Sequence, residues 1–211
     1  MNDKKKLEAN LINQRFNMLK LHHTNTLKEA IDTKVVDEPI IPFLLEITKI
    51  PNIFTSSSCC GRVMLLISDE FENKKYSHFL ERYHRLVNFE EIKEAISSSS
   101  KGEAWFKVEP FIFHFGCKDY KTAKKILLFA RDFGLKKSGI INVKRGRYVI
   151  EVNNTSFIST IVKIDSKQLI SDDYLKVLVD KANTKLDLNF KKLKDFEKKF
   201  LDEFLEVAKE E

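Results

Sequence analysis

Residues 55–62 hold the densest group of side chains that could do chemistry. Between two segments predicted as strands the sequence reads Thr55-Ser56-Ser57-Ser58-Cys59-Cys60-Gly61-Arg62. Hydroxyls and backbone N–H groups in such a turn can hold an anionic group, and an arginine can clamp a carboxylate or phosphate through two hydrogen bonds. Serine-rich turns are also common without any ligand, because serine pairs readily with nearby backbone. By itself the run leaves a binding site and a structural turn both open.

The cysteines offer two further chemistries, and the pattern argues against both. Cys59 could be a nucleophile if Arg62 or His114 lowered its pKa, but no cysteine-protease signature surrounds it. Cys117 and His114 could join the cysteine pair as zinc ligands, but the sequence has no Cys-x-x-Cys spacing. We therefore expect no metal.

His114 and Trp105 are the other single residues with chemical potential. His114 lies in Phe111-Ile112-Phe113-His114-Phe115, where alternation puts it on the strand face opposite the phenylalanines. It shares that face with Gly116, which leaves room for a ligand, although a core histidine bonded to backbone fits the spacing better. Trp105, the one tryptophan, could stack on a nucleobase or face a sulfonium, or fill a core.

Positive charge favours an acidic partner. The net charge is +6, and nucleic acid is the usual partner of basic domains, although lysine-rich surfaces often serve only solubility. The candidate phosphate contacts are Lys136, Lys137, Lys144, Arg145 and Arg147. No G-x-G-x-x-G turn and no G-x-x-x-x-G-K-[ST] run occurs, so a Rossmann dinucleotide site and a P-loop are not supported.

These residues must be positioned by strands in the middle of the chain and long helices at its ends. Helical periodicity predicts helices over 3–32, 39–51, 89–96, 121–133 and 172–209. Strands are expected at 53–57, 63–67, 104–108, 111–115, 140–144, 147–152 and 157–164. We expect a tight turn at Gly61, a break at Pro110, an irregular loop or ragged helix over 69–84, and a serine linker at 97–100.

This order favours the α+β class, with a central mixed or antiparallel sheet flanked by helices. The length of 211 residues fits a single domain over 1–211. Three cysteines cannot pair completely, which favours a reducing cytoplasm. No segment approaches the roughly 20 apolar residues of a membrane span, so we expect no membrane contact. The oligomeric state stays open.

The motif at 57–62 resembles the Ser-Ser-Cys-Ser/Ala-Gly-Arg signature of the wybutosine-synthesis methyltransferase family. Cys60 stands where that family usually has Ser or Ala, and Leu135-Lys136 replaces a more usual Phe-Arg. Further matches follow in the family's order, covering about 10–205: Lys101-Gly102, Ala104-Trp105, Glu109 to His114, Phe133-Gly134-Leu135, Ser138-Gly139-Ile140, Tyr174-Leu175, Leu178-Val179 and Ala182-Asn183.

The resemblance implies methyl transfer from S-adenosylmethionine to the N-4 nitrogen of a tricyclic guanosine derivative, 3′ of the anticodon in phenylalanine tRNA. It implies a fold other than the Rossmann methyltransferase. It places Ser57, Ser58, Arg62, Trp105, Ser138 and Gly139 around the cofactor in one cleft, with His114 and Cys59 at the chemistry. His114 could take the proton released on nitrogen methylation, and Arg62 could bind the methionine carboxylate or a tRNA phosphate.

Two rival hypotheses remain at this stage. The chain could be a non-catalytic tRNA-binding protein that retains the same cleft, which would not bind S-adenosylmethionine in calorimetry. It could also be a cysteine-dependent enzyme built on Cys59, which predicts rapid labelling of that thiol below neutral pH.

Overall fold

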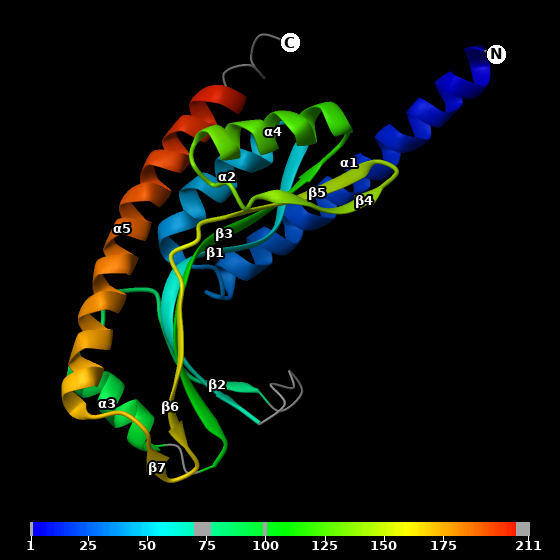
Figure 1. The fold of residues 1–211 in the computed structure, drawn as a ribbon. Coiled ribbons are helices and arrows are strands. Elements are labelled where there is room, and N and C mark those ends of the chain that lie inside the picture. The colour runs from blue at the N-terminus through cyan, green and yellow to red at the C-terminus, as the bar shows by residue number, and fades with distance from the viewer. Residues whose placement is uncertain (1, 70–76, 99–100, 206–211) are drawn as a thin grey trace. The chain divides into compact units, whose positions relative to one another are not determined.

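The computed structural model describes residues 2–69, 77–98 and 101–205, without the side chains of 2–4 (Figure 1). In chain order the elements are α1 (Asn2–Asp32), the 3-10 helix η1 (Glu38–Ile40), α2 (Ile41–Lys49), β1 (Ile53–Ser68), β2 (His78–Tyr83), α3 (Phe89–Ser98), β3 (Glu103–Cys117), α4 (Tyr120–Asp132), β4 (Gly139–Lys144), β5 (Arg147–Asn153), β6 (Ile158–Ile164), β7 (Lys167–Gln168) and α5 (Asp172–Phe204). No helix within these ranges is long and apolar enough to cross a bilayer.

The strands form one sheet in the order β2-β1-β3-β5-β4, with β6 paired to β3 and β7 paired to β6. The strands pair antiparallel in β1 with β2, β3 with β5, β3 with β6, β4 with β5, and β6 with β7. Long helices stand at both ends of the chain, coloured blue and red in Figure 1. The predicted α+β class is confirmed.

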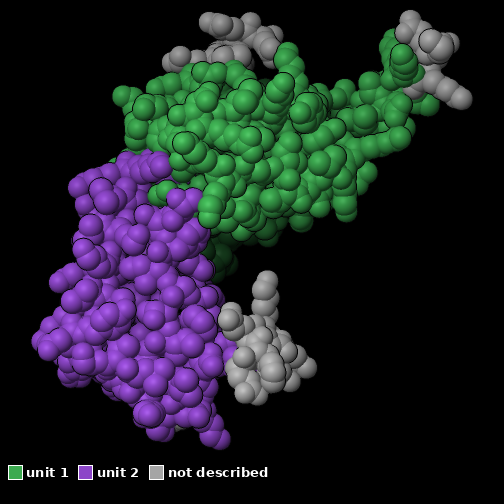
Figure 2. Space-filling model, viewed as in Figure 1, with its two compact units in different colours: residues 1–60, 112–154, 193–211 green, residues 61–111, 155–192 purple. Residues whose placement is uncertain are grey.

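The chain divides into two compact units, each assembled from separate segments (Figure 2). Unit 1 contains residues 1–60, 112–154 and 193–211, and unit 2 contains 61–111 and 155–192. β1, β3 and α5 therefore contribute residues to both units. The expectation of a single domain over 1–211 stays a prediction.

The core of unit 1 is made of phenylalanine rings on one face of β3. Phe113 stacks on Phe196 of α5 at a centroid distance of 5.9 Å, and Phe115 stacks on Phe200 at 4.8 Å. Phe43 of α2 meets Phe113 edge-on at 5.1 Å. Offset and edge-to-face pairs of this kind add attraction beyond the burial of their area.

Helix α1 contacts the residues on the other face of β3 in unit 1. A Cβ at Gly116 would lie 2.1 Å from the ring of Phe54, so only glycine lets this ring pack there. His23 of α1 stacks on Phe54 at 4.5 Å, and Phe16 lies 5.7 Å from it. Lys20 donates to the carbonyl oxygens of Ile50 and Ile53, and burial lowers the pKa of its amine to about 8.

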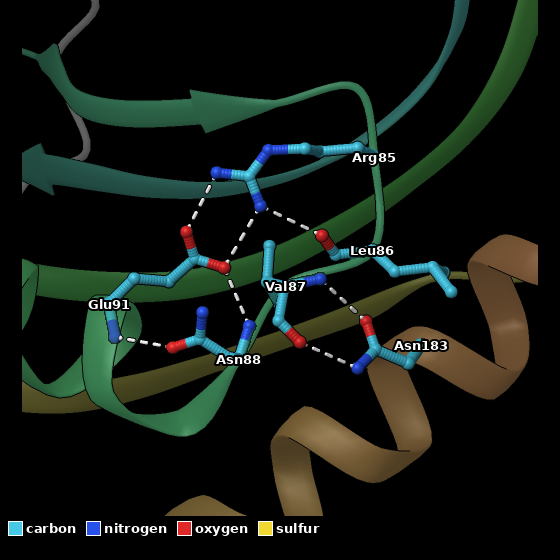
Figure 3. Close-up of polar contacts among 6 residues, drawn as sticks. All are labelled: Arg85, Leu86, Val87, Asn88, Glu91 and Asn183. Carbon is cyan, nitrogen blue, oxygen red and sulfur yellow. Dashed lines mark hydrogen bonds and ion pairs between the residues drawn. The ribbon is translucent and has the colours of Figure 1, made fainter.

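Unit 2 has an aliphatic core on one face of its strands. Val63 and Leu65 of β1 and Phe106 of β3 are fully buried with Leu175 of α5 and Ile92 of α3. The turn that leads into α3 is held by polar contacts (Figure 3). Two segments far apart in the sequence meet at this turn. Asn183 of α5 accepts from the Val87 N–H at 2.9 Å and donates to the Val87 carbonyl at 2.7 Å.

Close to the Asn183–Val87 contact, Arg85 forms two hydrogen bonds to the Glu91 carboxylate, with N···O distances of 3.0 and 2.7 Å. Asn88 caps α3 by accepting from the Glu91 N–H, and Glu91 accepts in return from the Asn88 N–H. Asn183, a residue of the predicted family motif, therefore has a structural contact in this unit.

The predicted turn at Gly61 is wrong. β1 runs unbroken through it, with Gly61 at φ +100°. A Cβ there would lie 2.5 Å from Asn189 and 3.1 Å from the Glu109 carbonyl oxygen. Glycine permits this backbone conformation and this close approach, so the residue deforms a strand instead of reversing the chain.

The predicted strand break at Pro110 is also wrong, because β3 is continuous from Glu103 to Cys117. Residues 103–108 pair with β6, and residues 112–117 pair with β5. Pro110 falls between the two ladders, where its missing N–H breaks neither. The next N–H, of Phe111, donates to Asn189 Oδ1 at 2.8 Å.

Two irregular segments were partly misjudged. Residues 78–83 form a strand instead of a loop, paired to β1 with a register shift between Leu65 and Leu66. Ser97 and Ser98 belong to α3. The rest of those predictions, at 70–76 and 99–100, and the end of the last helix at 206–209 lie outside the described residues.

Candidate functional site

A polar row crosses the strands of unit 1 on the face opposite the phenylalanine core. His114 of β3 is paired in register with Glu151 of β5, and Glu151 is paired with Gly139 of β4. His114 Nε2 lies 3.0 Å from Glu151 Oε2. The other carboxylate oxygen accepts from Asn153 Nδ2 at 2.8 Å. Both oxygens of Glu151 are thus used to fix neighbouring side chains.

The serine run of β1 reaches the same row. Lys118 N–H donates to the Asn52 carbonyl at 3.1 Å, and Gly116 faces Phe54. Counting along the antiparallel strands from these contacts puts Ser56 opposite His114 and Ser58 opposite Ile112. Residues directly opposite each other share a face, so Ser56, His114, Glu151 and Gly139 form one row across unit 1.

The contact with Glu151 decides which nitrogen of His114 can act. An ionised carboxylate only accepts hydrogen bonds, so Nε2 must carry the hydrogen. In the neutral ring the acceptor lone pair is then on Nδ1. The arrangement of a histidine oriented by a carboxylate is that of a general base held in one tautomer.

Several buried polar atoms of unit 1 lack a hydrogen-bond partner among the described residues. They are Ser58 Oγ, Ser138 Oγ, Asn153 Oδ1 and Glu197 Oε1. Ser138 is only 2% exposed and directly precedes Gly139 in the row. A buried hydroxyl without a partner costs about 1–3 kcal/mol. Three such atoms on or next to the polar row are what a site built for a polar ligand would show.

A pocket of about 210 Å³ opens beside the serine run in unit 1. His23, Thr26, Leu27 and Ala30 of α1 line one part of it, with Val35, Val36, Leu44 and Thr55 to Ser58 completing the wall. Burial, together with His22 and Arg147, lowers the pKa of His23. Pockets for whole cofactors hold roughly 300–1,000 Å³, so this one can take only part of such a molecule.

Arg62 and Trp105 lie in unit 2, in a second pocket of about 370 Å³ on the face opposite the aliphatic core. Arg62 donates through Nε and Nη2 to Glu109 Oε2, at 3.0 and 2.7 Å. Trp105 Nε1–H donates to Glu103 Oε2 at 3.2 Å. Since the other predicted cofactor residues belong to unit 1, the expectation of one shared cleft stays a prediction.

The buried cysteines are poor nucleophiles. Burial and the nearby Asp37 carboxylate raise the pKa of Cys60, and burial raises that of Cys117, so both thiols stay protonated. The Cys60 N–H donates to Asp37 Oδ2 at 2.8 Å. Cys59 is half-buried, and all three cysteines are free of disulfides. The role predicted for Cys59 and the expectation of no metal both stay predictions.

The predicted phosphate contacts lie at the two ends of β4. Lys136 and Lys137 are exposed just before it, and Lys144 and Arg147 are paired at the hairpin end. Arg145 is exposed at the hairpin tip and contacts Glu8 of α1 at 3.0 Å. Four of the five are exposed and Arg147 is half-buried, which agrees with an RNA contact and equally with a solvated surface.

Sequence reasoning missed Glu151, Asn153 and Asp37. Glu151 could have been found, because it lies in the predicted strand 147–152. An acidic residue on a strand that pairs with the strand of His114 is a candidate partner for the imidazole. Nothing in the sequence indicated that Asn153 would reach Glu151, or that Asp37, from the link after α1, would reach the Cys60 backbone.

Comparison with known proteins identifies relatives across nearly the whole chain. The family model described as Methyltransferase TYW3 matches residues 13–202. A protein of Pyrococcus abyssi named tRNA(Phe) 7-((3-amino-3-carboxypropyl)-4-demethylwyosine(37)-N(4))-methyltransferase 1 is 32% identical over 186 residues, 88% of this chain and 96% of that protein. A Methanocaldococcus jannaschii methyltransferase of the same name without the final numeral is 36% identical over 161 residues, 76% and 83% of the two chains.

Solved structures agree. A Pyrococcus horikoshii protein superposes with a TM-score of 0.83 at 31% identity, covering 89% of this chain and 97% of that one. An Aeropyrum pernix protein described as hypothetical superposes with a TM-score of 0.66 at 27% identity, covering 77% and 96%. The family predicted from the Ser-Cys-Arg motif is thereby confirmed, and this chain belongs to the methyltransferase TYW3 family.

Proposed function

We propose that this chain methylates the N-4 nitrogen of a 4-demethylwyosine-type nucleoside in phenylalanine tRNA, using S-adenosylmethionine. The observation that carries the proposal is the family match over 13–202, with relatives named for that reaction at 32% and 36% identity. We infer a cytoplasmic location too, because the substrate is tRNA and the cysteines form no disulfide in the described structure.

The polar groups of unit 1 fit such a cofactor. S-adenosylmethionine carries an amino-acid end and a ribose that need hydrogen-bond partners, and Ser58 Oγ and Ser138 Oγ are buried without one among the described residues. At Gly139 an added Cβ would meet nothing within 4 Å. We therefore assign Ser57, Ser58, Ser138 and Gly139 to holding the cofactor, which supplies an electrophilic methyl group when bound.

His114 is the group we assign to the proton. Methylation of a ring N–H would break the methyl–sulfur bond of the cofactor, leave that electron pair on sulfur, form an N–C bond and release the ring proton. With Nε2 bound to Glu151, Nδ1 is the acceptor available to receive it. Glu151 is a positioning residue in this scheme, since it acts on the substrate only through the imidazole. Methyl transfer needs alignment of donor and acceptor above all, which a rigid row of strand residues provides.

The tRNA must reach unit 1, and the cations of β4 and its flanks, all exposed except the half-buried Arg147, are our candidates for its phosphates. Lys136, Lys137, Lys144, Arg145 and Arg147 would each contribute sequence-independent attraction that weakens as salt rises. Glu8 partly neutralises Arg145, so we expect Arg145 to contribute less than Lys144.

The test is a methyl-transfer assay on phenylalanine tRNA isolated from cells that lack this protein. Nucleosides are digested and analysed by mass spectrometry, and the demethylated nucleoside should gain one methyl group. His114→Ala should slow the reaction by about 10²- to 10⁴-fold, the usual contribution of a general base. His78→Ala, at an exposed histidine of β2, is the matched control and should leave the rate unchanged.

Near-wild-type turnover by the His114 variant would remove that residue from the chemistry while leaving the reaction in place. No methyl transfer by the wild-type chain, with tRNA bound but S-adenosylmethionine not bound in calorimetry, would favour a non-catalytic tRNA-binding protein.

A further inference from the structure

The open face of the unit 2 strands carries two aromatic side chains together with cations. Phe79 of β2 is 42% exposed, and Trp105 of β3 is half-buried. Both line the 370 Å³ pocket together with Arg62 and Lys107. The opposite face is filled by the aliphatic core, so packing of unit 2 does not require these rings.

Cations accompany both rings. The guanidinium carbons of Arg62 and Arg82 lie 5.2 and 4.7 Å from the centroid of Phe79. The Lys107 ammonium lies 5.4 Å from the Trp105 ring. Nucleobases stack on guanidinium planes as well as on aromatic rings, and single-stranded RNA is commonly read on the open face of a sheet in this way. Phosphates next to a stacked base would lie within reach of these cations.

The acidic groups on this face have defined partners. Glu109 binds Arg62, and Glu103 accepts from the Trp105 indole. Among the described residues neither Arg82 nor Lys107 forms an ion pair, so their charges are available for an anionic partner. Among these described residues, three cations (Arg62, Arg82 and Lys107) stand beside two carboxylates (Glu103 and Glu109). An acidic strand fits this face better than a cation or an apolar peptide.

The positions of the rings indicate two stacking places. β2 and β3 both neighbour β1, so their backbones are about 10 Å apart at the usual strand spacing. Trp105 is oriented by Glu103, and Phe79 is flanked by two arginines. The rings are therefore held apart and fixed, as a surface for successive unpaired bases would require.

We propose that Phe79, Trp105, Arg62, Arg82 and Lys107 form a stacking platform for unpaired nucleotides of the RNA substrate. The proposal rests on the proposed function, since it assigns the tRNA loop to this face. The resemblance to the family placed Arg62 and Trp105 at the cofactor, whereas the platform assigns both residues to the RNA.

Trp105 provides a direct readout, because it is the one tryptophan of the chain. The full-length protein is titrated with an anticodon stem-loop RNA, with a fully paired RNA of equal length, and with S-adenosylmethionine alone, while tryptophan emission is followed. The stem-loop should quench the emission and the paired RNA should not, since stacking on the indole requires an unpaired base.

Two variants locate the platform. Phe79→Ala should weaken stem-loop binding about 10-fold, the scale of one lost base stack. Phe157→Ala removes another exposed phenylalanine of unit 2, 52% exposed and outside the pocket, and should change nothing. Lys107→Gln should reduce the slope of log affinity against log salt by about one phosphate contact.

Other outcomes overturn the proposal in distinguishable ways. If fluorescence anisotropy of labelled RNA shows binding while Trp105 emission and the Phe79 variant are unaffected, the platform is wrong but the proposed methylation stands. Quenching by S-adenosylmethionine alone would indicate that Trp105 contacts the cofactor and not the RNA, and the platform would be wrong. If the stem-loop does not bind at all, both the platform and the RNA substrate are wrong.

Discussion

The two units use their strands in the same way but present different chemistry. In each unit one face is buried against helices, by phenylalanine rings in unit 1 and by aliphatic side chains in unit 2. On the other face unit 1 carries the His114–Glu151 row with buried hydroxyls that lack partners in the described structure. Unit 2 carries aromatic rings beside cations, of which Arg62 is paired with Glu109 while Arg82 and Lys107 form no ion pair among the described residues.

This difference separates two tasks within the proposed reaction. Unsatisfied buried hydroxyls are costly and are relieved by a small polar ligand that brings its own donors and acceptors. Exposed rings among cations favour a large flexible anion that can stack and be released. We therefore expect unit 1 to determine cofactor binding and chemistry, and unit 2 to determine RNA affinity.

The largest effect should come from the buried face of unit 1. Phe113→Ala removes a fully buried ring that packs on Phe43, Phe115 and Phe196. The free energy of unfolding should fall by about 3–5 kcal/mol, measured by urea denaturation. Phe79→Ala on the open face of unit 2 is the control and should cost less than about 1 kcal/mol. Equal losses would mean that Phe79 is a core residue and that the two faces are not distinct.

A smaller effect is expected at Glu197 of α5, whose Oε1 is buried without a partner among the described residues. Burial raises the pKa of its carboxyl to about 7, partly offset by Lys194. The folded state therefore keeps a proton that the unfolded state loses near its ordinary pKa of about 4.5. Stability contributed by this group is complete at low pH and falls as pH rises from about 4.5 to 7.

Glu197→Gln should remove that decline. At about pH 8 the variant should be more stable than the wild type by on the order of 1 kcal/mol, a value kept small because solvent screens this half-buried carboxyl. Little difference is expected at about pH 4.5, and denaturant unfolding at both values measures it. Lys194→Gln is the matched control. It should raise the pKa of the Glu197 carboxyl slightly, because the Lys194 charge lowers that pKa. If stability depended on pH in the same way in Glu197→Gln and in the wild type, the Glu197 carboxyl would be solvated. Glu197 Oε1 would then not count among the buried atoms of unit 1 that lack a partner in the described structure.

The smallest effect on stability should come from Ser138→Ala, because the hydroxyl it removes has no partner in the described residues. The free energy of unfolding should stay constant or rise by up to about 1 kcal/mol. S-adenosylmethionine affinity, measured by calorimetry, should fall about 10-fold, because a ligand hydrogen bond is worth about 1–1.5 kcal/mol. Ser98→Ala, which removes a hydroxyl bonded to the Ala95 carbonyl, should leave that affinity unchanged. A destabilised Ser138 variant with normal affinity would make the hydroxyl structural.

The α+β order, the terminal helices and the β4–β5 hairpin were predictable because they depend on local signals. Gly134 ends α4 with φ +91°, and its N–H and that of Leu135 donate to Arg131 and Ala130, which is the bonding expected when glycine follows a helix. Gly61 and Pro110 misled the prediction because both usually interrupt strands. Here a contact with Asn189 and a change of partner strand let each strand continue.

The sequence by itself determined the family, through motifs whose residue types and order are specific, and it determined which strand face His114 occupies, through alternation of period two. Only the tertiary structure decided that Glu151 fixes the His114 tautomer, that Ser138 is buried without a bond, and that Arg62 and Trp105 belong to a different unit from the serines. The physical reason is range: periodicity and capping act within a few residues, whereas strand register and helix packing join residues that lie tens of positions apart.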